Sequence, residues 1–232
     1  MSGIRGGAHL LAIALFAALL AATPARAELV LSQLIVDFQP GNKLRDDVEI
    51  WNDSSDRSFV SIEPREIIDP SLPSQGVRRD PDPEKLGLLV SPTRMILEPG
   101  ERKLIRIAVL SSDPGREHVY RVTVKPVAGP IQSDDSGLKL LVGYDLLVLV
   151  RPSQPIPRIS GVRTGRTLTF SNSGNVSVEI VDGRQCSSGG SHCVDLPGKR
   201  LYPGASWSVQ LPSDLPAEYS LKSPGKTDRR AY

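Results

Sequence analysis

Apolar and polar residues alternate in short runs along most of this chain, a pattern typical of half-buried β-strands. The runs are rich in valine, isoleucine and leucine, and glycines and prolines, 20 of each, recur between them. No segment sustains the 3.6-residue apolar period of an amphipathic helix. The pattern predicts an all-β chain whose first part resembles an immunoglobulin-like sandwich, with strands near residues 29–38, 47–52, 58–64, 87–90, 102–110, 118–127 and 138–150.

The last of these strands, within LKLLVGYDLLVLVRP (138–152), is about twice the usual ~5–6 residues. Its even-numbered face is apolar throughout, whereas its odd-numbered face begins polar and ends apolar. We therefore expect the second half, with Leu147, to be covered on both faces and to belong to the core of its domain. Lys139 alone guards the first half, and the polar segment 132–137 before it predicts a mobile loop. The first half is either an edge strand open to a partner or part of an ordinary central strand.

Pro152, Pro155 and Pro157 then predict a stiff, extended connector, because each proline fixes its own φ and restricts the residue before it. Beyond the connector we expect a smaller β-sandwich and a disordered, charged tail from Ser223 to Tyr232. The two predicted domains span residues 28–151 and 152–232 and meet at an angle that leaves a cleft. The strands expected in the second domain lie near residues 167–172, 177–181, 199–202, 206–211 and 218–221.

Residues 1–27 have the three parts of a secretory signal: a basic head, an apolar run and an Ala-Arg-Ala motif. We expect cleavage after Ala27. The apolar run of about 13 residues is shorter than the ~20 that span a bilayer, so we expect a soluble exported protein without membrane insertion. Without the two arginines of this leader, basic and acidic residues balance at 26 each, which argues against a nucleic-acid partner.

Two cysteines, Cys186 and Cys193, lie close together in QCSSGGSHCV. In an oxidising compartment such a pair favours a disulfide that closes a small loop. A metal site would recruit His192, but it would offer three ligands instead of the four usual for structural zinc. We expect a disulfide, no metal and no cofactor.

Catalytic motifs are hard to find in the sequence. His118 and His192 are the only histidines beyond the leader, and the chain has no G-x-S-x-G elbow, no H-E-x-x-H helix and no phosphate-binding glycine loop. We therefore do not expect an enzyme.

Three segments together resemble the periplasmic pilus chaperones of the chaperone–usher pathway. They are LVSPTRMILEPGERKLIRI (89–107), REHVYRVTVKPV (116–127) and LKLLVGYDLLVLVRP (138–152), and their order and spacing match as well. The cysteine loop and the following KRLYPGASW (199–207) are most similar to the branch that serves colonisation-factor and common-pilus fimbriae, the alpha-type chaperones. The alternatives are a structural pilin or adhesin and another exported immunoglobulin-like binding protein. A pilin would carry an N-terminal donor extension and lack its own last strand.

The resemblance implies a mechanism in which the chaperone lends its last first-domain strand to a pilus subunit and passes the subunit to an outer-membrane usher. Main-chain hydrogen bonds give affinity in this binding mode, and alternate side chains fill pockets. Pilus chaperones are a known example of this binding mode. On the match, the subunit-binding residues are Leu138, Leu140, Val142 and Tyr144. The partners implied are pilus subunits and the usher, and the location is the periplasm.

The resemblance also implies charged residues between the domains and in the cleft. Glu117 and Arg151 fall where the family uses an interdomain salt bridge. The family's third partner, an acid in the second domain, has no clear counterpart, and Lys222 lies near that place.

A further departure concerns the basic anchor for the subunit's terminal carboxylate. Ile35 and Leu147 stand where family members carry an arginine and a lysine, which leaves Arg121 and Lys125 as candidate basic anchors.

Overall fold

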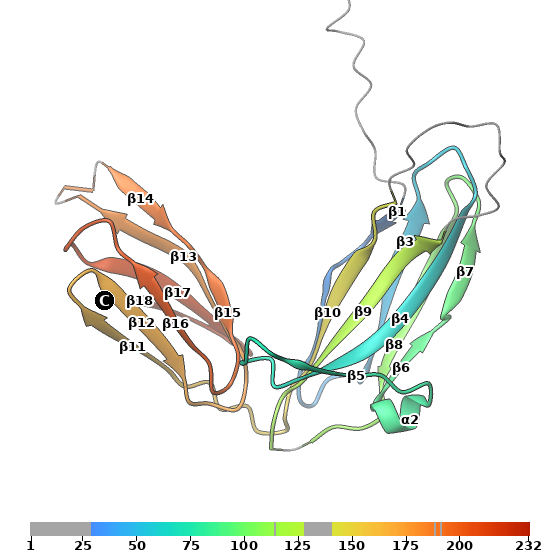
Figure 1. Ribbon diagram of the computed structural model, residues 1–232, viewed down its shortest axis with the longest axis horizontal. Helices are drawn as coiled ribbons and strands as arrows, with labels where there is room; N and C mark the ends of the chain where they lie inside the picture. Colours follow the sequence, from blue (N-terminus) through green and yellow to red (C-terminus); the bar gives the residue numbers. More distant parts are fainter. Residues whose placement is uncertain (1–28, 114, 128–140, 188, 191) are drawn as a thin grey trace, which may run out of the picture.

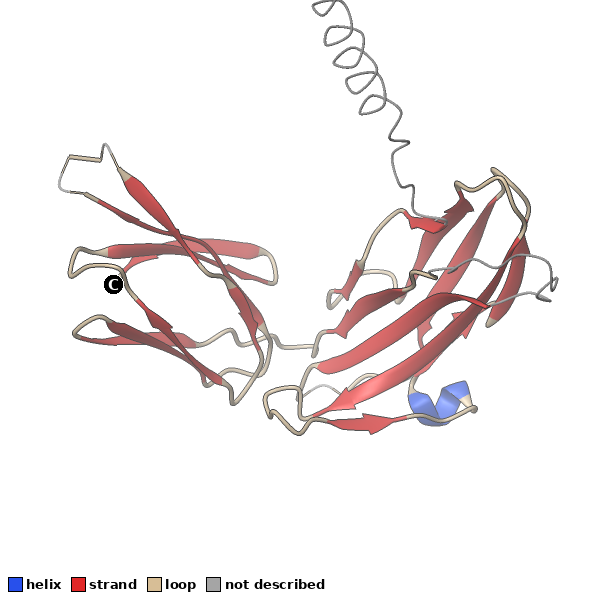
Figure 2. Cartoon of the chain, turned by 45° about the horizontal axis from the view of Figure 1, so that its top comes forward, coloured by secondary structure: helices blue, strands red, loops and turns tan. Residues whose placement is uncertain are grey.

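The computed structural model describes residues 29–113, 115–127, 141–187, 189–190 and 192–232. Within these ranges the chain is almost entirely β-strand and forms two β-sandwiches that meet at an angle (Figure 1), with one short helix at the side of the first (Figure 2). The predicted fold class, all-β with two immunoglobulin-like domains, is confirmed. No helix in the described residues is long and apolar enough to cross a membrane.

The first domain packs two sheets face to face. One has the strand order β1-β3-β8-β6, and the other has the order β2-β10-β9-β4-β5, with β7 also paired to β4. The short helix α2 (Pro83–Leu86) starts at Asp82, whose side chain accepts a hydrogen bond from the Glu84 N–H, as an N-cap residue does. The strands are β1 (Leu29–Leu31), β2 (Ile35–Phe38), β3 (Arg45–Asn52), β4 (Ser58–Ile68), β5 (Gly76–Arg78), β6 (Leu88–Ser91), β7 (Arg94–Leu97), β8 (Arg102–Val109), β9 (His118–Val127) and β10 (Tyr144–Val150).

The expected first strand, residues 29–38, is two strands in different sheets. β1 pairs antiparallel with β3, whereas β2 pairs parallel with β10. The chain crosses between the sheets at residues 32–34, where the Ser32 N–H donates to the Glu49 carbonyl and the Leu34 carbonyl accepts from the Leu147 N–H. The prediction of one continuous strand was therefore wrong. The break was not predicted because both halves have strand-like sequences and the crossing residues carry no turn signal.

The second domain packs the sheet β11-β12-β16 against the sheet β14-β13-β17-β18, with β15 also paired to β13. Phe170 and Tyr219 lie in its core, with ring centroids 5.1 Å apart and the rings nearly perpendicular, an arrangement that aromatic pairs prefer. The strands are β11 (Ile159–Thr164), β12 (Thr167–Asn172), β13 (Val178–Cys186), β14 (Cys193–Leu196), β15 (Lys199–Leu201), β16 (Ser206–Gln210), β17 (Ala217–Ser223) and β18 (Lys226–Ala231).

The charged tail is ordered, contrary to the prediction of disorder. β17 and β18 form a hairpin, and the ring of Tyr232 packs edge-on against Phe170 in the core. Most side chains of β18 face solvent, so its sequence carries the charges of a protected edge strand and no apolar alternation. Composition alone therefore gave the wrong answer for this segment.

The predicted disulfide between Cys186 and Cys193 is confirmed. The two residues are direct cross-strand partners at the tip of the β13–β14 hairpin, with Cα atoms 4.0 Å apart. The bridge therefore closes the loop that joins the two strands.

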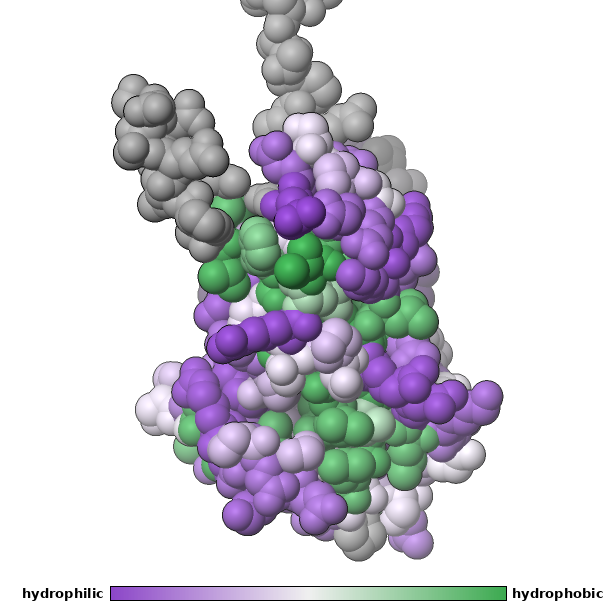
Figure 3. All heavy atoms as spheres, turned by 90° about the vertical axis from the view of Figure 1, so that its right-hand side faces the viewer, coloured by the Kyte–Doolittle hydropathy of each residue, from purple (hydrophilic) through white to green (hydrophobic). Residues whose placement is uncertain are grey.

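Apolar residues are not confined to the interior of the first domain. Figure 3 shows apolar patches among charged residues on the side that faces away from the second domain. Ile96, Leu104 and Val127 are among the exposed large apolar side chains of this domain.

Candidate functional site

β10 lies between β2 and β9 and has two buried faces. Leu146, Val148 and Val150 enter the core of the sandwich. Leu147 and Leu149 point to the opposite face, where they join a smaller cluster that Tyr202 of the second domain covers. The second half of the predicted strand is thus covered on both sides. Leu147, however, lies in this interdomain cluster and not in the main core of the first domain, which corrects our expectation for it.

The first half of the predicted strand is described only in part. Leu138 and Leu140 lie outside the described residues, as do the leader and the segment 132–137. Val142 is 53% exposed and precedes β10. Tyr144 is half-buried against the core, and its hydroxyl donates a 2.7 Å hydrogen bond to the Leu29 carbonyl.

One side of β10 is open at its start. On the β9 side, the pairing runs from Tyr144 to Val150. On the β2 side, the pairing covers only Leu147 to Val150. Among the described residues, Tyr144 to Leu146 therefore have no strand neighbour on the β2 side, and the unpaired edge of this sheet begins there.

The two candidate anchors, Arg121 and Lys125, lie on the same face of β9 as Val119. The Arg121 guanidinium donates to the Asp145 carbonyl at 3.3 Å, and Lys125 lies 2.9 Å from Glu63. The hydrogen bond from Lys125 is the largest cause that lowers the pKa of the Glu63 carboxyl.

A second arginine near Arg121 was not predicted from the sequence. Arg65 is the cross-strand partner of Arg121, and it donates a 2.8 Å hydrogen bond to the Asp145 carboxylate. The length of β4, which is longer than predicted, is what brings Arg65 opposite β9.

The two apolar replacements noted in the sequence lie side by side. Ile35 on β2 and Leu147 on β10 are Cα partners in the parallel ladder. Ile35 is 47% exposed, whereas Leu147 is 6% exposed. The position is therefore apolar on both strands, and neither side chain can offer a charge.

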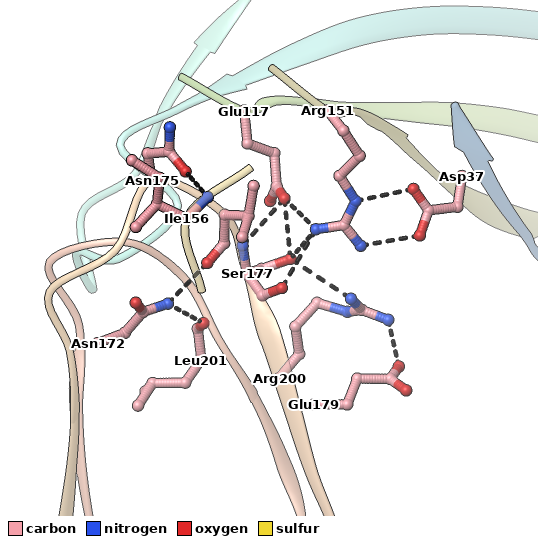
Figure 4. A network of polar contacts seen from close by, with 11 residues as sticks. Asp37, Glu117, Arg151, Ile156, Asn172, Asn175, Ser177, Glu179, Arg200 and Leu201 are labelled. Carbon is pink, nitrogen blue, oxygen red and sulfur yellow. Dashed lines mark hydrogen bonds and ion pairs between the residues drawn. The ribbon is translucent and has the colours of Figure 1, made fainter. Parts of the chain in front are cut away.

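Arg151 and Glu117 meet at the junction between the domains (Figure 4). Their side chains are 3% and 1% exposed. Burial alone would lower the pKa of Arg151, but hydrogen bonds from Arg151 to Asp37 and the charge of Glu117 raise it above its ordinary value. The second domain joins through Ser177, whose N–H donates to Glu117 Oε2 at 2.9 Å and whose carbonyl accepts from Arg151 Nη1 at 3.1 Å.

The second carboxylate at Arg151 also comes from the first domain. Asp37 on β2 accepts hydrogen bonds from Arg151 Nε at 2.7 Å and from Nη2 at 2.8 Å. Lys222, which the sequence placed near this role, instead lies 3.8 Å from Asp182. Alternation places Asp37 on the same face of β2 as Ile35, but only the parallel pairing of β2 with β10 brings it to Arg151.

A pocket of about 600 Å³ lies beside this junction, with lining residues from both domains. On its first-domain side, Glu66 Oε1 lies 2.6 Å from His118 Nδ1, and Arg78 Nε donates to Glu66 Oε2 at 2.8 Å. Burial raises the pKa of Glu66, but these hydrogen bonds outweigh it and hold the pKa below its ordinary value. Among the described residues, no group of three or more His, Cys, Asp or Glu side chains is placed to hold a metal.

Comparison with solved structures places the fold among fimbrial chaperones. The class 5 fimbriae chaperone CfaA superposes with a TM-score of 0.62 at 23% identity, over 88% of this chain and 98% of that one. The Pseudomonas aeruginosa CupB2 chaperone gives 0.57 at 16% identity, over 87% and 98%. A chain from the Salmonella enterica complex of the SafA pilin with the SafB chaperone gives 0.63 at 18% identity, over 90% and 98%. No protein-family model and no curated protein sequence matches the chain.

Proposed function

We propose that this protein is a periplasmic chaperone that holds pilus subunits by lending them a strand and delivers them to an outer-membrane usher. The open side of β10 at Tyr144–Leu146 is the observation that carries the proposal. An incoming strand can pair with the main chain there without displacing β2. The fold likeness to chaperones, one of them solved with a pilin, supports the same function.

In this proposal the donated side chains are Leu138, Leu140 and Val142, with Tyr144 at the boundary. They share the even-numbered face whose later members fill the chaperone's own core. A groove on the subunit would then continue the apolar face of β10 beyond the sandwich. This arrangement is strand addition, in which the backbone supplies affinity and alternate side chains supply specificity.

Arg121 and Lys125 are our candidates for anchoring the terminal carboxylate of the subunit. Among the described residues, Arg121 donates only to a main-chain carbonyl within hydrogen-bond distance, and its nearest carboxylate contact, to Asp145, is 4.0 Å long. Lys125 has a closer carboxylate partner, and its side chain is 47% exposed. Ile35 and Leu147 carry no charge. In this proposal, the basic side chains of Arg121 and Lys125 therefore anchor the terminal carboxylate of the subunit.

The leader completes the proposal. Cleavage after Ala27 would release the domains 28–151 and 152–232 into the periplasm, where an oxidised Cys186–Cys193 pair is expected.

A substitution pair tests the donated strand. Leu140→Asp should leave the protein folded but unable to capture its subunit, because a carboxylate would be forced into an apolar groove. Desolvating an unpaired charge costs several kcal/mol, and ~1.4 kcal/mol is a factor of ten in affinity. The matched control is Leu104→Asp, at an exposed leucine on the outer face of the other sheet. Co-purification with a pilin encoded beside the gene should fail for the first variant and succeed for the second. Normal capture by Leu140→Asp would remove this strand from the mechanism.

A further inference from the structure

The guanidinium of Arg151 binds two separate sets of partners. Its Nε and Nη2 atoms are bound side by side by the two oxygens of Asp37, while its Nη1 atom reaches Glu117 and Ser177. Because the guanidinium is planar, a carboxylate that fixes Nε and Nη2 also fixes the direction in which Nη1 points. Asp37 therefore determines where Arg151 presents its remaining donors.

The second domain meets this pair through both the main chain and the side chain of Ser177. The Ser177 hydroxyl accepts from Arg151 Nη1 at 3.1 Å and donates to Glu117 Oε2 at 3.2 Å. The Ser177 N–H binds Glu117 and the Ser177 carbonyl binds Arg151. Glu179, the nearby acid on β13, pairs with Arg200 instead. Among the described residues, no second-domain carboxylate forms an ion pair with Arg151.

β2 connects this junction to the cleft. The Leu34 carbonyl accepts from the Leu147 N–H at 2.9 Å at one end of the strand, and the Phe38 carbonyl accepts from the Arg151 N–H at 3.0 Å at the other. Ile35 and Asp37 lie on one face of these four residues, the first exposed in the cleft and the second bound to Arg151. A single short strand thus carries both the cleft surface and the residue that holds the junction.

We propose that Asp37 is the positioning residue that sets the orientation of the second domain, by aiming Arg151 and Glu117 at the main chain of Ser177. Both carboxylates that pair with Arg151 come from the first domain, and the second domain contributes the peptide groups and the hydroxyl of Ser177. The orientation is a property of the free protein. Only its consequence, that strand β2 links subunit occupancy to domain orientation, rests on the proposed function.

The test measures the distance between the domains in the free, full-length protein. Spin labels on non-natural side chains at the exposed positions Asp56 and Asp214 report the distribution of interdomain distances by double electron–electron resonance. Asp37→Asn should broaden this distribution at least twofold. Asp47→Asn is the matched control, because it removes an equivalent bidentate carboxylate, the one on Arg106, from a sheet remote from the junction. Its distribution should stay as narrow as that of the unsubstituted protein.

Two further variants separate the main-chain contact from side-chain alternatives. Ser177→Ala removes the hydroxyl and its bonds to Arg151 and Glu117 but keeps the N–H and the carbonyl, and it should leave the distribution narrow. Glu179→Gln should also leave it narrow, because Glu179 does not touch Arg151. A narrow distribution for Asp37→Asn, or a broad one for Glu179→Gln or Ser177→Ala, would overturn the proposal.

A spectroscopic measurement covers the case in which Asp37→Asn does not fold. In the unsubstituted protein, the Nε–H of Arg151 should give a resolved nitrogen-15 signal that is protected from solvent exchange by its bond to Asp37. Ser177→Ala should keep that protection. Rapid exchange of this proton in the unsubstituted protein would contradict the positioning role, whatever the fate of the variant.

Discussion

Neighbouring residues of β10 serve different interfaces, so the position of a substitution decides which one it damages. Leu147→Asp places a carboxylate in the cluster that Tyr202 covers, whereas Val148→Asp places one in the main core of the first domain. Each buries a charge at a cost of several kcal/mol. We expect Val148→Asp to unfold the first domain and Leu147→Asp to leave it folded while loosening the second. Circular dichroism with limited proteolysis of the connector 152–157 separates the two, and loss of β-structure in Leu147→Asp would contradict the assignment.

The ring of Tyr232 packs edge-on against Phe170 in the second domain, and a substitution at Gly161 should disturb this contact. A Cβ atom at Gly161 would overlap the ring of Tyr232, so Gly161→Ala must displace the ring from Phe170. Overpacking of this kind costs about 1–3 kcal/mol. Thermal unfolding should show the loss, whereas Gly189→Ala, which meets nothing within 4 Å, should be neutral. Equal melting temperatures for the two variants would mean that Tyr232 is not packed as described.

At the scale of elements, apolar alternation predicted most of the strands that have one buried face, although it missed β7. It located β9, β12 and β17 well because their inward side chains are apolar and their outward ones polar. It missed β5 and β18, whose residues are nearly all exposed and whose strand form comes from pairing with β4 and β17. In the candidate site, Glu117 and Arg151 came from a family resemblance, whereas Asp37 required the parallel pairing of β2 with β10, which a sequence cannot display.

The disulfide of the β13–β14 hairpin should stabilise the second domain. Closing so short a loop contributes about 2–3 kcal/mol in the chain-entropy model. Replacing Cys186 and Cys193 together by serine should therefore lower the melting temperature of the second domain and leave the first unchanged. Calorimetry resolves the two transitions. An unchanged second transition would mean that the strand pairing of β13 and β14 alone holds the hairpin.

For the whole molecule, the charges beside the junction predict a pH dependence. The folded pKa of Glu66 is held below its ordinary value of 4.5 by His118 and Arg78. A carboxyl with a depressed pKa contributes stability that is present above its unfolded pKa and is lost as the pH falls through the folded value. Stability should thus decline below about pH 4.5, and Glu66→Gln should flatten this part of the profile. Chemical denaturation from pH 6 to pH 3 measures both, and an equally steep decline in Glu66→Gln would assign the effect to other groups.

In the proposed function, the segment that leads into β10 becomes a strand of a pilus subunit's sheet. Hydrogen–deuterium exchange on the complex with the neighbouring pilin tests it most directly, because pairing protects main-chain amides whatever the side chains do. We predict that peptides covering residues 138–146 become strongly protected when the subunit binds, whereas β16 of the second domain exchanges as in the free protein. Unchanged exchange across residues 138–146 in a stable complex would contradict strand donation.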